Sequence, residues 1–71
     1  MNIQTVADNL RNTIKGKEDM LYSVQRERTM VGLRDGEDIA LKTIAQFLTI
    51  NINELERILQ DVEQCMEKVE V

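Results

Sequence analysis

Apolar residues recur in one unbroken heptad register through the second half of the chain. Every seventh position holds Leu41, Leu48, Leu55, Val62 and Val69. Neighbouring positions widen the stripe with Ile44, Ala45, Ile52, Ile58, Leu59, Cys65 and Met66. A stripe of this width is typical of a helix that is buried along one side. The pattern therefore predicts a long amphipathic helix over residues 37–69.

The first segment predicts a second amphipathic helix, over residues 3–32. One face collects Ile3, Val6, Ala7, Leu10 and Ile14, and the stripe continues with Leu21, Val24 and Val31. Lys17 and Arg28 interrupt it. Asn2 or Thr5 can cap its beginning. Gly16 lies between two lysines and is the expected place for a kink or a break, because glycine costs about 1 kcal/mol in a helix interior.

Glycines mark the expected turn between the two helices. Gly32 and Gly36 bracket three residues, and the chain has no proline. A glycine in the left-handed conformation commonly follows the end of a helix, and an aspartate commonly precedes the beginning of one. We therefore expect the turn at residues 32–36, with Gly32 ending the first helix and Asp35 capping the second.

The fold class that follows is all-α, a helical hairpin forming a single domain over residues 1–71. The chain is small, its single cysteine cannot form an internal disulfide, and residues 3–32 are too poor in apolar side chains to cover the stripe alone. We therefore expect a homodimer, an antiparallel four-helix bundle with coiled-coil packing. The predicted oligomer interface comprises Leu41, Ile44, Leu48, Asn51, Ile52, Leu55, Ile58, Leu59, Val62, Cys65, Met66 and Val69.

Residues 49–53 leave two structures open for the second helix. This stretch is rich in β-branched residues and asparagine, which lower helix propensity. In one structure the helix continues and Asn51 is a buried polar residue that sets the register. In the other the helix ends near Leu48 and restarts, with Asn51 as its cap and Glu54 three residues later. The heptad register persists across the stretch and favours the continuous helix.

The broken alternative resembles a helix-turn-helix over residues 41–60. The stretch LKTIAQFLTININELERIL places Ile44, Ala45, Leu48, Ile50, Leu55 and Ile58 at the apolar positions of that motif family. Thr49 stands where the family usually has glycine. The resemblance implies a DNA-binding regulator whose second helix presents Asn51, Asn53, Glu54, Glu56, Arg57, Gln60 and Asp61. Three carboxylates against one arginine oppose binding to phosphates.

Charge is distributed unevenly along the chain. Residues 1–34 carry six basic and four acidic side chains, whereas residues 35–71 carry three basic and nine acidic ones, and the net charge of −4 disfavours a nucleic-acid partner. We expect a regulatory or adaptor-like protein that binds another protein. The alternative is a subunit or assembly chaperone of a larger complex. The surface expected to meet a basic partner comprises Glu54, Glu56, Asp61, Glu63 and Glu67.

The chemistry of the side chains does not predict an enzyme. The chain has no histidine and only two aromatic residues, Tyr22 and Phe47. The lone Cys65 lies on the apolar stripe, where we expect a small core side chain and not a reactive thiol. No catalytic, cofactor-binding or metal-binding residue is therefore expected. The chain shows neither a signal peptide nor an apolar run long enough for a membrane span, so we expect a cytoplasmic protein.

Overall fold

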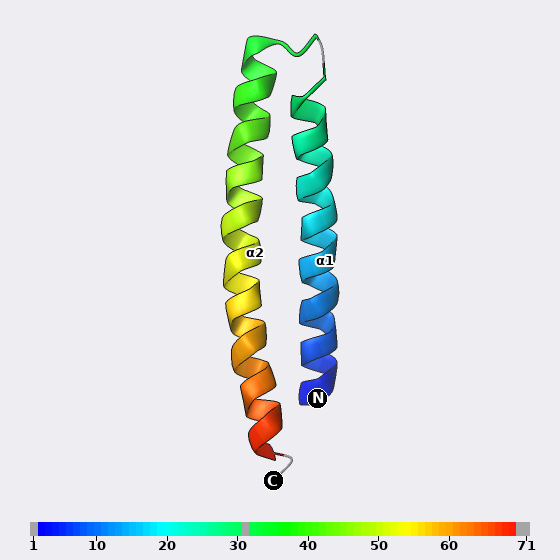
Figure 1. Cartoon of the computed structure of the whole chain (residues 1–71), viewed down its shortest axis with the longest axis vertical. Coiled ribbons are helices and arrows are strands. Elements are labelled where there is room, and N and C mark those ends of the chain that lie inside the picture. The colour runs from blue at the N-terminus through cyan, green and yellow to red at the C-terminus, as the bar shows by residue number, and fades with distance from the viewer. Residues whose placement is uncertain (1, 31, 70–71) are drawn as a thin grey trace.

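The protein is a hairpin of two long antiparallel helices. A computed structural model describes residues 2–30 and 32–69, without the side chains of residues 35, 68 and 69. Helix α1 spans Ile3–Arg28 and helix α2 spans Asp35–Val69, and the two termini lie at the same end of the rod (Figure 1). The rod measures 57 × 17 × 15 Å. Its radius of gyration of 16.4 Å exceeds the roughly 11 Å of a compact domain of this length.

Helix α1 begins where the sequence predicts and ends earlier. The Asn2 side chain accepts a hydrogen bond of 2.8 Å from the backbone N–H of Gln4, which confirms Asn2 as the cap. The predicted end at residue 32 is wrong, because α1 ends at Arg28. Thr29 follows it, and both its backbone N–H and its hydroxyl donate to the carbonyl oxygen of Arg26. These local bonds close the last turn before Gly32 is reached.

The turn between the helices covers residues 29–34. Gly32 adopts a left-handed conformation, with φ of 98°, which is the conformation expected for it. Helix α2 begins at Asp35, two residues before the predicted start. The carbonyl oxygen of Arg34 accepts the N–H groups of Glu37 and Asp38 in the first turn of α2. The side chain of Asp35, expected to cap this helix, lies outside the described residues. Val31, expected on the apolar stripe, lies outside the described residues.

Both helices continue through the stretches where the sequence is least favourable to a helix. Helix α1 passes through Gly16, so the break considered there does not occur. Helix α2 passes through residues 49–53, which confirms the continuous structure. The Thr49 hydroxyl donates to the Ala45 carbonyl oxygen at 2.9 Å, so this side chain bonds back within the helix instead of starting a turn. The turn that a helix-turn-helix needs is therefore absent from residues 41–60.

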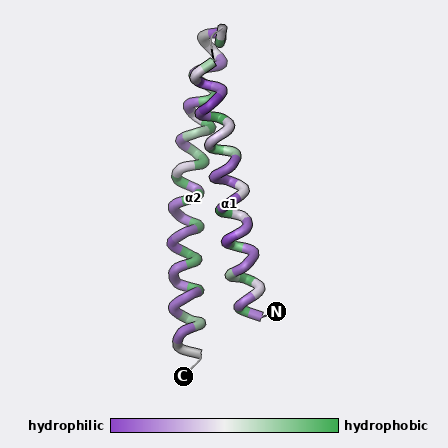
Figure 2. Tube along the Cα trace, turned by 45° about the vertical axis from the view of Figure 1, so that its right-hand side comes forward, coloured by the Kyte–Doolittle hydropathy of each residue, from purple (hydrophilic) through white to green (hydrophobic). Residues whose placement is uncertain are grey.

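The two helices meet along one seam with alternating spacings of four and three residues. In α1 the seam consists of Ile3, Ala7, Leu10, Ile14, Lys17, Leu21, Val24 and Arg28. In α2 it consists of Leu41, Ala45, Leu48, Ile52, Leu55, Leu59, Val62 and Met66. All sixteen are buried or half-buried, as in a two-stranded coiled coil. Figure 2 shows the corresponding hydrophobic bands on the facing sides of the helices.

This seam uses only part of the interface predicted from the sequence. Seven residues of that set are buried or half-buried in the seam of the hairpin: Leu41, Leu48, Ile52, Leu55, Leu59, Val62 and Met66. Ile44, Ile58 and Cys65 lie one position outside the seam and are exposed. Cys65 is therefore not part of the core of the single hairpin, because the register turns it away from α1. The side chain of Val69 lies outside the described residues.

Candidate functional site

Two edges of different character flank the seam. Each heptad has two seam positions, such as Ile3 and Ala7. The residues directly after the first of them, such as Gln4, lie on one edge, and the residues directly before the second, such as Val6, lie on the opposite edge. The charged edge holds Gln4, Arg11, Glu18 and Gln25 of α1 with Lys42, Thr49, Glu56 and Glu63 of α2. The neutral edge holds Val6, Thr13, Met20 and Glu27 of α1 with Ile44, Asn51, Ile58 and Cys65 of α2.

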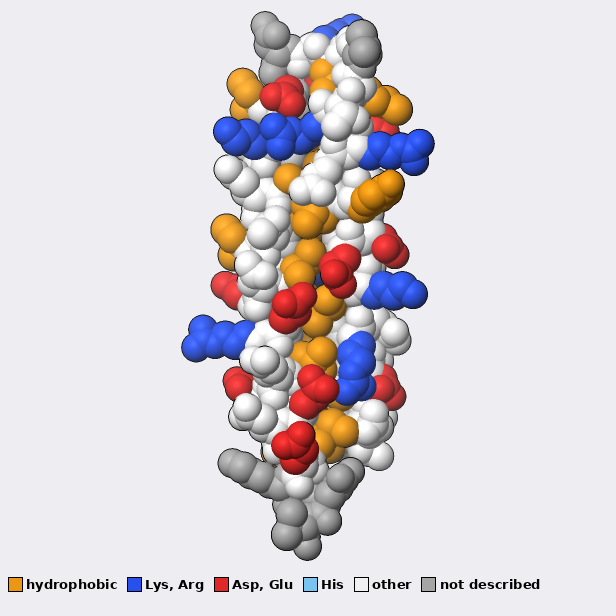
Figure 3. Space-filling view, in the orientation of Figure 1, with side chains coloured by type: hydrophobic (Ala, Val, Ile, Leu, Met, Phe, Trp, Pro, Cys, Tyr) orange, Lys and Arg blue, Asp and Glu red, His pale blue; other side chains and the backbone are white. Residues whose placement is uncertain are grey.

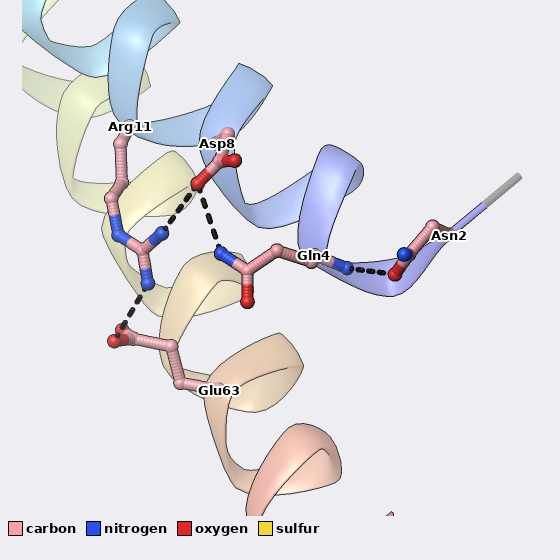
Figure 4. A network of polar contacts seen from close by, with 5 residues as sticks. All are labelled: Asn2, Gln4, Asp8, Arg11 and Glu63. Atoms are coloured by element: carbon pink, nitrogen blue, oxygen red, sulfur yellow. Dashed lines mark hydrogen bonds and ion pairs between the residues drawn. The ribbon is translucent and has the colours of Figure 1, made fainter.

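The charged edge is joined across the two helices by Arg11. Its guanidinium Nη1 lies 3.0 Å from Asp8 Oδ1 on the same helix, and Nη2 lies 3.3 Å from Glu63 Oε2 on α2 (Figure 4). Gln4 donates to the same Asp8 oxygen at 3.1 Å. The side chains of Arg11 and Glu63 are both more than two-fifths exposed, so the ion pair contributes little to stability. It links the first part of α1 to the later part of α2.

A second interhelical ion pair closes the seam near the turn. Arg28 Nε lies 3.2 Å from Asp38 Oδ1. Arg28 occupies a seam position that elsewhere holds an apolar residue, and its pairing explains why this interruption of the stripe is tolerated. Lys17, the other interruption, is half-buried in the seam, where its aliphatic stem can cover apolar surface.

The neutral edge exposes large apolar side chains. Met20 is 56% exposed, Ile44 43% and Ile58 49%, and Cys65 is also exposed. Glu27 is the one charged residue among the eight positions of this edge, whereas five of the eight on the charged edge carry a charge. A row of exposed apolar side chains rimmed by polar ones is typical of a protein-binding surface.

Helix α2 extends the neutral edge into a second seam. Its spacing again alternates between four and three residues, through Ala40, Ile44, Phe47, Asn51, Glu54, Ile58, Asp61 and Cys65. Phe47 is 63% exposed in this row. The beginning of the row is apolar, whereas Glu54 and Asp61 place two carboxylates in its later part. One helix thus presents two rows at heptad spacing, of which α1 covers one.

The acidic surface expected from the sequence is exposed but divided. Glu56 and Glu63 lie on the charged edge, Glu54 and Asp61 lie beside the neutral edge, and Glu67 points away from both. One of the five, Glu63, is paired with Arg11. The five share the later half of α2, a helix that carries three basic and eight acidic residues over 35–69. This half of α2 is therefore the most acidic part of the rod.

The described part of the hairpin offers a ligand its surface side chains and open grooves beside the seam, one of which is lined by Gln25, Arg28, Lys42, Ala45, Gln46, Thr49 and Ile50. Figure 3 shows one face of the rod, where a hydrophobic stripe runs between the helices with acidic and basic side chains beside it. Among the described residues, no three His, Cys, Asp or Glu side chains come together to hold a metal ion. Within the same residues, neither helix has the length and apolarity that crossing a bilayer requires.

Sequence reasoning missed the division of the apolar stripe between two edges. The signal was present in the first segment, where the four-and-three spacing from Ile3 to Arg28 runs without interruption once Lys17 and Arg28 are counted as seam residues. Reading both segments in this way separates Ile44 and Ile58 from the seam. The chain matches no protein-family model, no curated protein and no solved structure with which it was compared.

Proposed function

We propose that this protein is an acidic helical module that acts by binding other proteins, in a regulatory or adaptor-like role. In this proposal the hairpin pairs with a second copy to form an antiparallel four-helix bundle. The neutral edge supplies the surface between the copies. Glu56, Glu63 and Glu67, which lie off the neutral edge in the later half of α2, remain outside the bundle and form the surface that meets a basic partner.

The observation that carries the proposal is the amount of surface the hairpin leaves exposed. Its accessible surface is 5744 Å². A compact monomeric protein of 8.2 kDa exposes about 4,500 Å² by the scaling of surface with mass. The difference of about 1,200 Å² exceeds the roughly 800 Å² that one partner contributes to a standard protein interface. Pairing of two hairpins supplies a means of covering such an excess.

The position of the exposed apolar residues supports the same proposal. Met20, Ile44 and Ile58 are at least two-fifths exposed and share the neutral edge. Their exposure to water is unfavourable by about 25 cal/mol for each Å² of apolar surface. A partner that covers this edge gains that free energy without disturbing the ion pairs on the opposite edge.

The helix-turn-helix alternative has less support than the protein-binding module. Residues 41–60 lie within the single helix α2, so no separate recognition helix is available for a DNA groove. The later half of α2 is acidic and would be repelled by phosphates. A role as a subunit of a larger complex remains an outcome of the test below, since a different chain can supply the second pair of helices.

Sedimentation equilibrium of the purified chain over a wide concentration range tests the proposal. We expect a mass of twice 8.2 kDa at micromolar concentration. Fluorescence anisotropy with labelled duplex DNA, at low and at physiological salt, serves as the second measurement, and we expect no binding at either. A monomer at all concentrations would exclude the homodimer. Salt-dependent binding to DNA would exclude a module that binds proteins alone.

A further inference from the structure

We infer that the neutral edges of two copies face one another with their turns at opposite ends, so that the Asn51 residues of both copies meet on the two-fold axis. This inference rests on the proposed dimer and specifies its surface, its occupant and its direction. The occupant is a second copy of this chain. The residues that carry the inference are Ile44, Asn51 and Ile58.

The spacing along the neutral edge of α2 is symmetric about Asn51. Ile44 precedes Asn51 by seven residues and Ile58 follows it by seven. A two-fold interface brings the same surface of both copies together, so each residue meets its symmetric counterpart. When α2 lies antiparallel to α2 of the second copy, Asn51 meets Asn51 and Ile44 meets Ile58. Amide then faces amide, and apolar side chain faces apolar side chain.

Asn51 is suited to this central position. It is half-buried in the hairpin, and its amide makes no hydrogen bond with any of the described residues. An asparagine amide carries both donor and acceptor groups, so two amides related by a two-fold axis can donate to each other. A single asparagine among apolar residues at a helix interface is a known means of fixing register and orientation.

The acidic residues of the second seam favour this direction too. Glu54 and Asp61 lie in the later half of the row, and Phe47 and Ala40 lie in the earlier half. In the antiparallel pairing about Asn51, Glu54 lies opposite position 48 of the second copy and Asp61 opposite position 41, so the nearest residues of the facing row are Phe47 and Ala40. No carboxylate of this row then faces another carboxylate, although α2 as a whole is acidic.

The rival arrangement has both turns at the same end and packs α1 against α2 of the second copy. The neutral edge of α1 offers Val6, Thr13, Met20 and Glu27. Two of these are polar, and one of the two polar residues, Glu27, is charged. The isoleucines of α2 then face a row without matching symmetry. Net charge alone favours this rival, because α1 carries five basic and four acidic residues against the acidic α2. The match between facing residues of the two α2 rows outweighs this attraction between net charges, since interactions of exposed charges are screened by salt.

Disulfide trapping distinguishes the two arrangements. Two variants are made, Ile44→Cys and Ile58→Cys, each with Cys65→Ser to remove the native thiol. Each chain then carries a single cysteine, so every disulfide joins two chains. Mild oxidation is applied to each variant alone and to a mixture that has been unfolded and refolded together. Non-reducing gels report the covalent dimers.

We expect covalent dimers in the mixture, at least about ten times more than in either variant alone, because only the mixture places two thiols within bonding distance. Glu67→Ala in the same backgrounds removes a carboxylate that points away from both edges, and this matched control should leave the pattern unchanged. The rival arrangement places α2 against α1 of the second copy, so neither thiol meets a thiol of the other copy, and a mixture with no excess of covalent dimer would overturn the inference. Covalent dimers from each variant alone, and not from the mixture, would show two α2 helices lying parallel and would overturn it too.

The remaining outcomes separate this inference from the proposed function. A dimer by sedimentation that forms no covalent dimer in any of the three samples would overturn the pairing about Asn51 and leave the proposed dimer intact. A monomer by sedimentation would overturn both. Sedimentation of the Cys65→Ser protein without further change establishes which of these cases applies, because it retains both isoleucines.

Discussion

The two edges of this hairpin contain the same number of heptad positions and differ in almost everything else. The charged edge has ion pairs within and between the helices, centred on Arg11, and has no large apolar side chain among its eight positions. The neutral edge has one charge and exposes Met20, Ile44 and Ile58. Both edges flank one seam. The contrast therefore arises from the side chains themselves, because the positions on both edges lie directly beside the seam.

This difference indicates which edge of the rod is more stable in contact with water and which is more stable when covered. Charged side chains on one edge keep that edge hydrated and resist association, whereas an uncharged apolar edge gains free energy when it is covered. A hairpin with two charged edges would be a soluble rod with no preferred side for a partner. In the proposed dimer, the neutral edge is the side for a second copy, and Glu56, Glu63 and Glu67 stay accessible on the rest of α2.

The largest effect is expected in the seam that both edges share. Leu48 is 3% exposed, so Leu48→Ala removes packed methyl groups and should lower the free energy of unfolding by about 2 to 5 kcal/mol. Ile39 is 67% exposed, and Ile39→Ala should cost less than about 0.5 kcal/mol. Urea denaturation followed by circular dichroism measures both. Equal losses would mean that the described seam is not the core.

The next effect is expected on the neutral edge. Ile58→Asp places a carboxylate at each of two symmetric positions in the proposed interface and should weaken the dimer roughly a hundredfold, about 2.7 kcal/mol. Ile50 is 60% exposed and lies off this edge, so Ile50→Asp is the matched control and should leave the dimer unchanged. Sedimentation velocity of both variants tests the contrast. Loss of the dimer in Ile50→Asp alone would assign the interface to another side.

A smaller effect, of opposite sign, is expected at the centre of the neutral edge. Asn51→Leu exchanges an amide for an apolar contact and should raise the free energy of unfolding by about 1 kcal/mol, while the unique direction of pairing is lost. Thermal unfolding measures the first change, and disulfide trapping through positions 44 and 58 measures the second. A lower melting temperature would indicate that Asn51 is needed within the hairpin itself.

The smallest effect is expected on the charged edge. The exposed pair between Arg11 and Glu63 should contribute about 0.2 to 1 kcal/mol, and less at high salt. A double-mutant cycle with Arg11→Ala and Glu63→Ala, measured at low and high salt, isolates the coupling between the two side chains. A coupling above about 2 kcal/mol would show that this edge stabilises the hairpin far more than its exposure allows.

Much of the fold could be predicted from the periodicity of the sequence. The all-α hairpin, the Asn2 cap and the left-handed Gly32 are confirmed, and so is the continuous helix through residues 49–53. The helix continues through residues 49–53, which have low helix propensity, because packing along the seam outweighs local propensity. For the same reason Gly16 does not break α1.

Other features depended on contacts that the sequence alone does not display. The end of α1 at Arg28 reflects hydrogen bonds of Thr29, and a side chain of this type is compatible with both a helix and a turn. The division of the stripe into seam and neutral edge depends on how α1 and α2 face one another. The sequence alone predicts Cys65 in the core, because it does not show that this part of the stripe faces away from α1. In the hairpin Cys65 is exposed. The apolar stripe of α2 alone does not specify which of its residues face α1 and which stay exposed.

The dependence of the melting temperature on protein concentration tests most directly whether a second copy covers the neutral edge. Folding coupled to pairing makes stability depend on concentration, so a hundredfold dilution should lower the melting temperature by about 5 to 10 °C. The Ile58→Asp variant should melt lower, with a weaker dependence. A melting temperature of the natural chain that does not change with dilution, together with a mass of 8.2 kDa, would contradict the account.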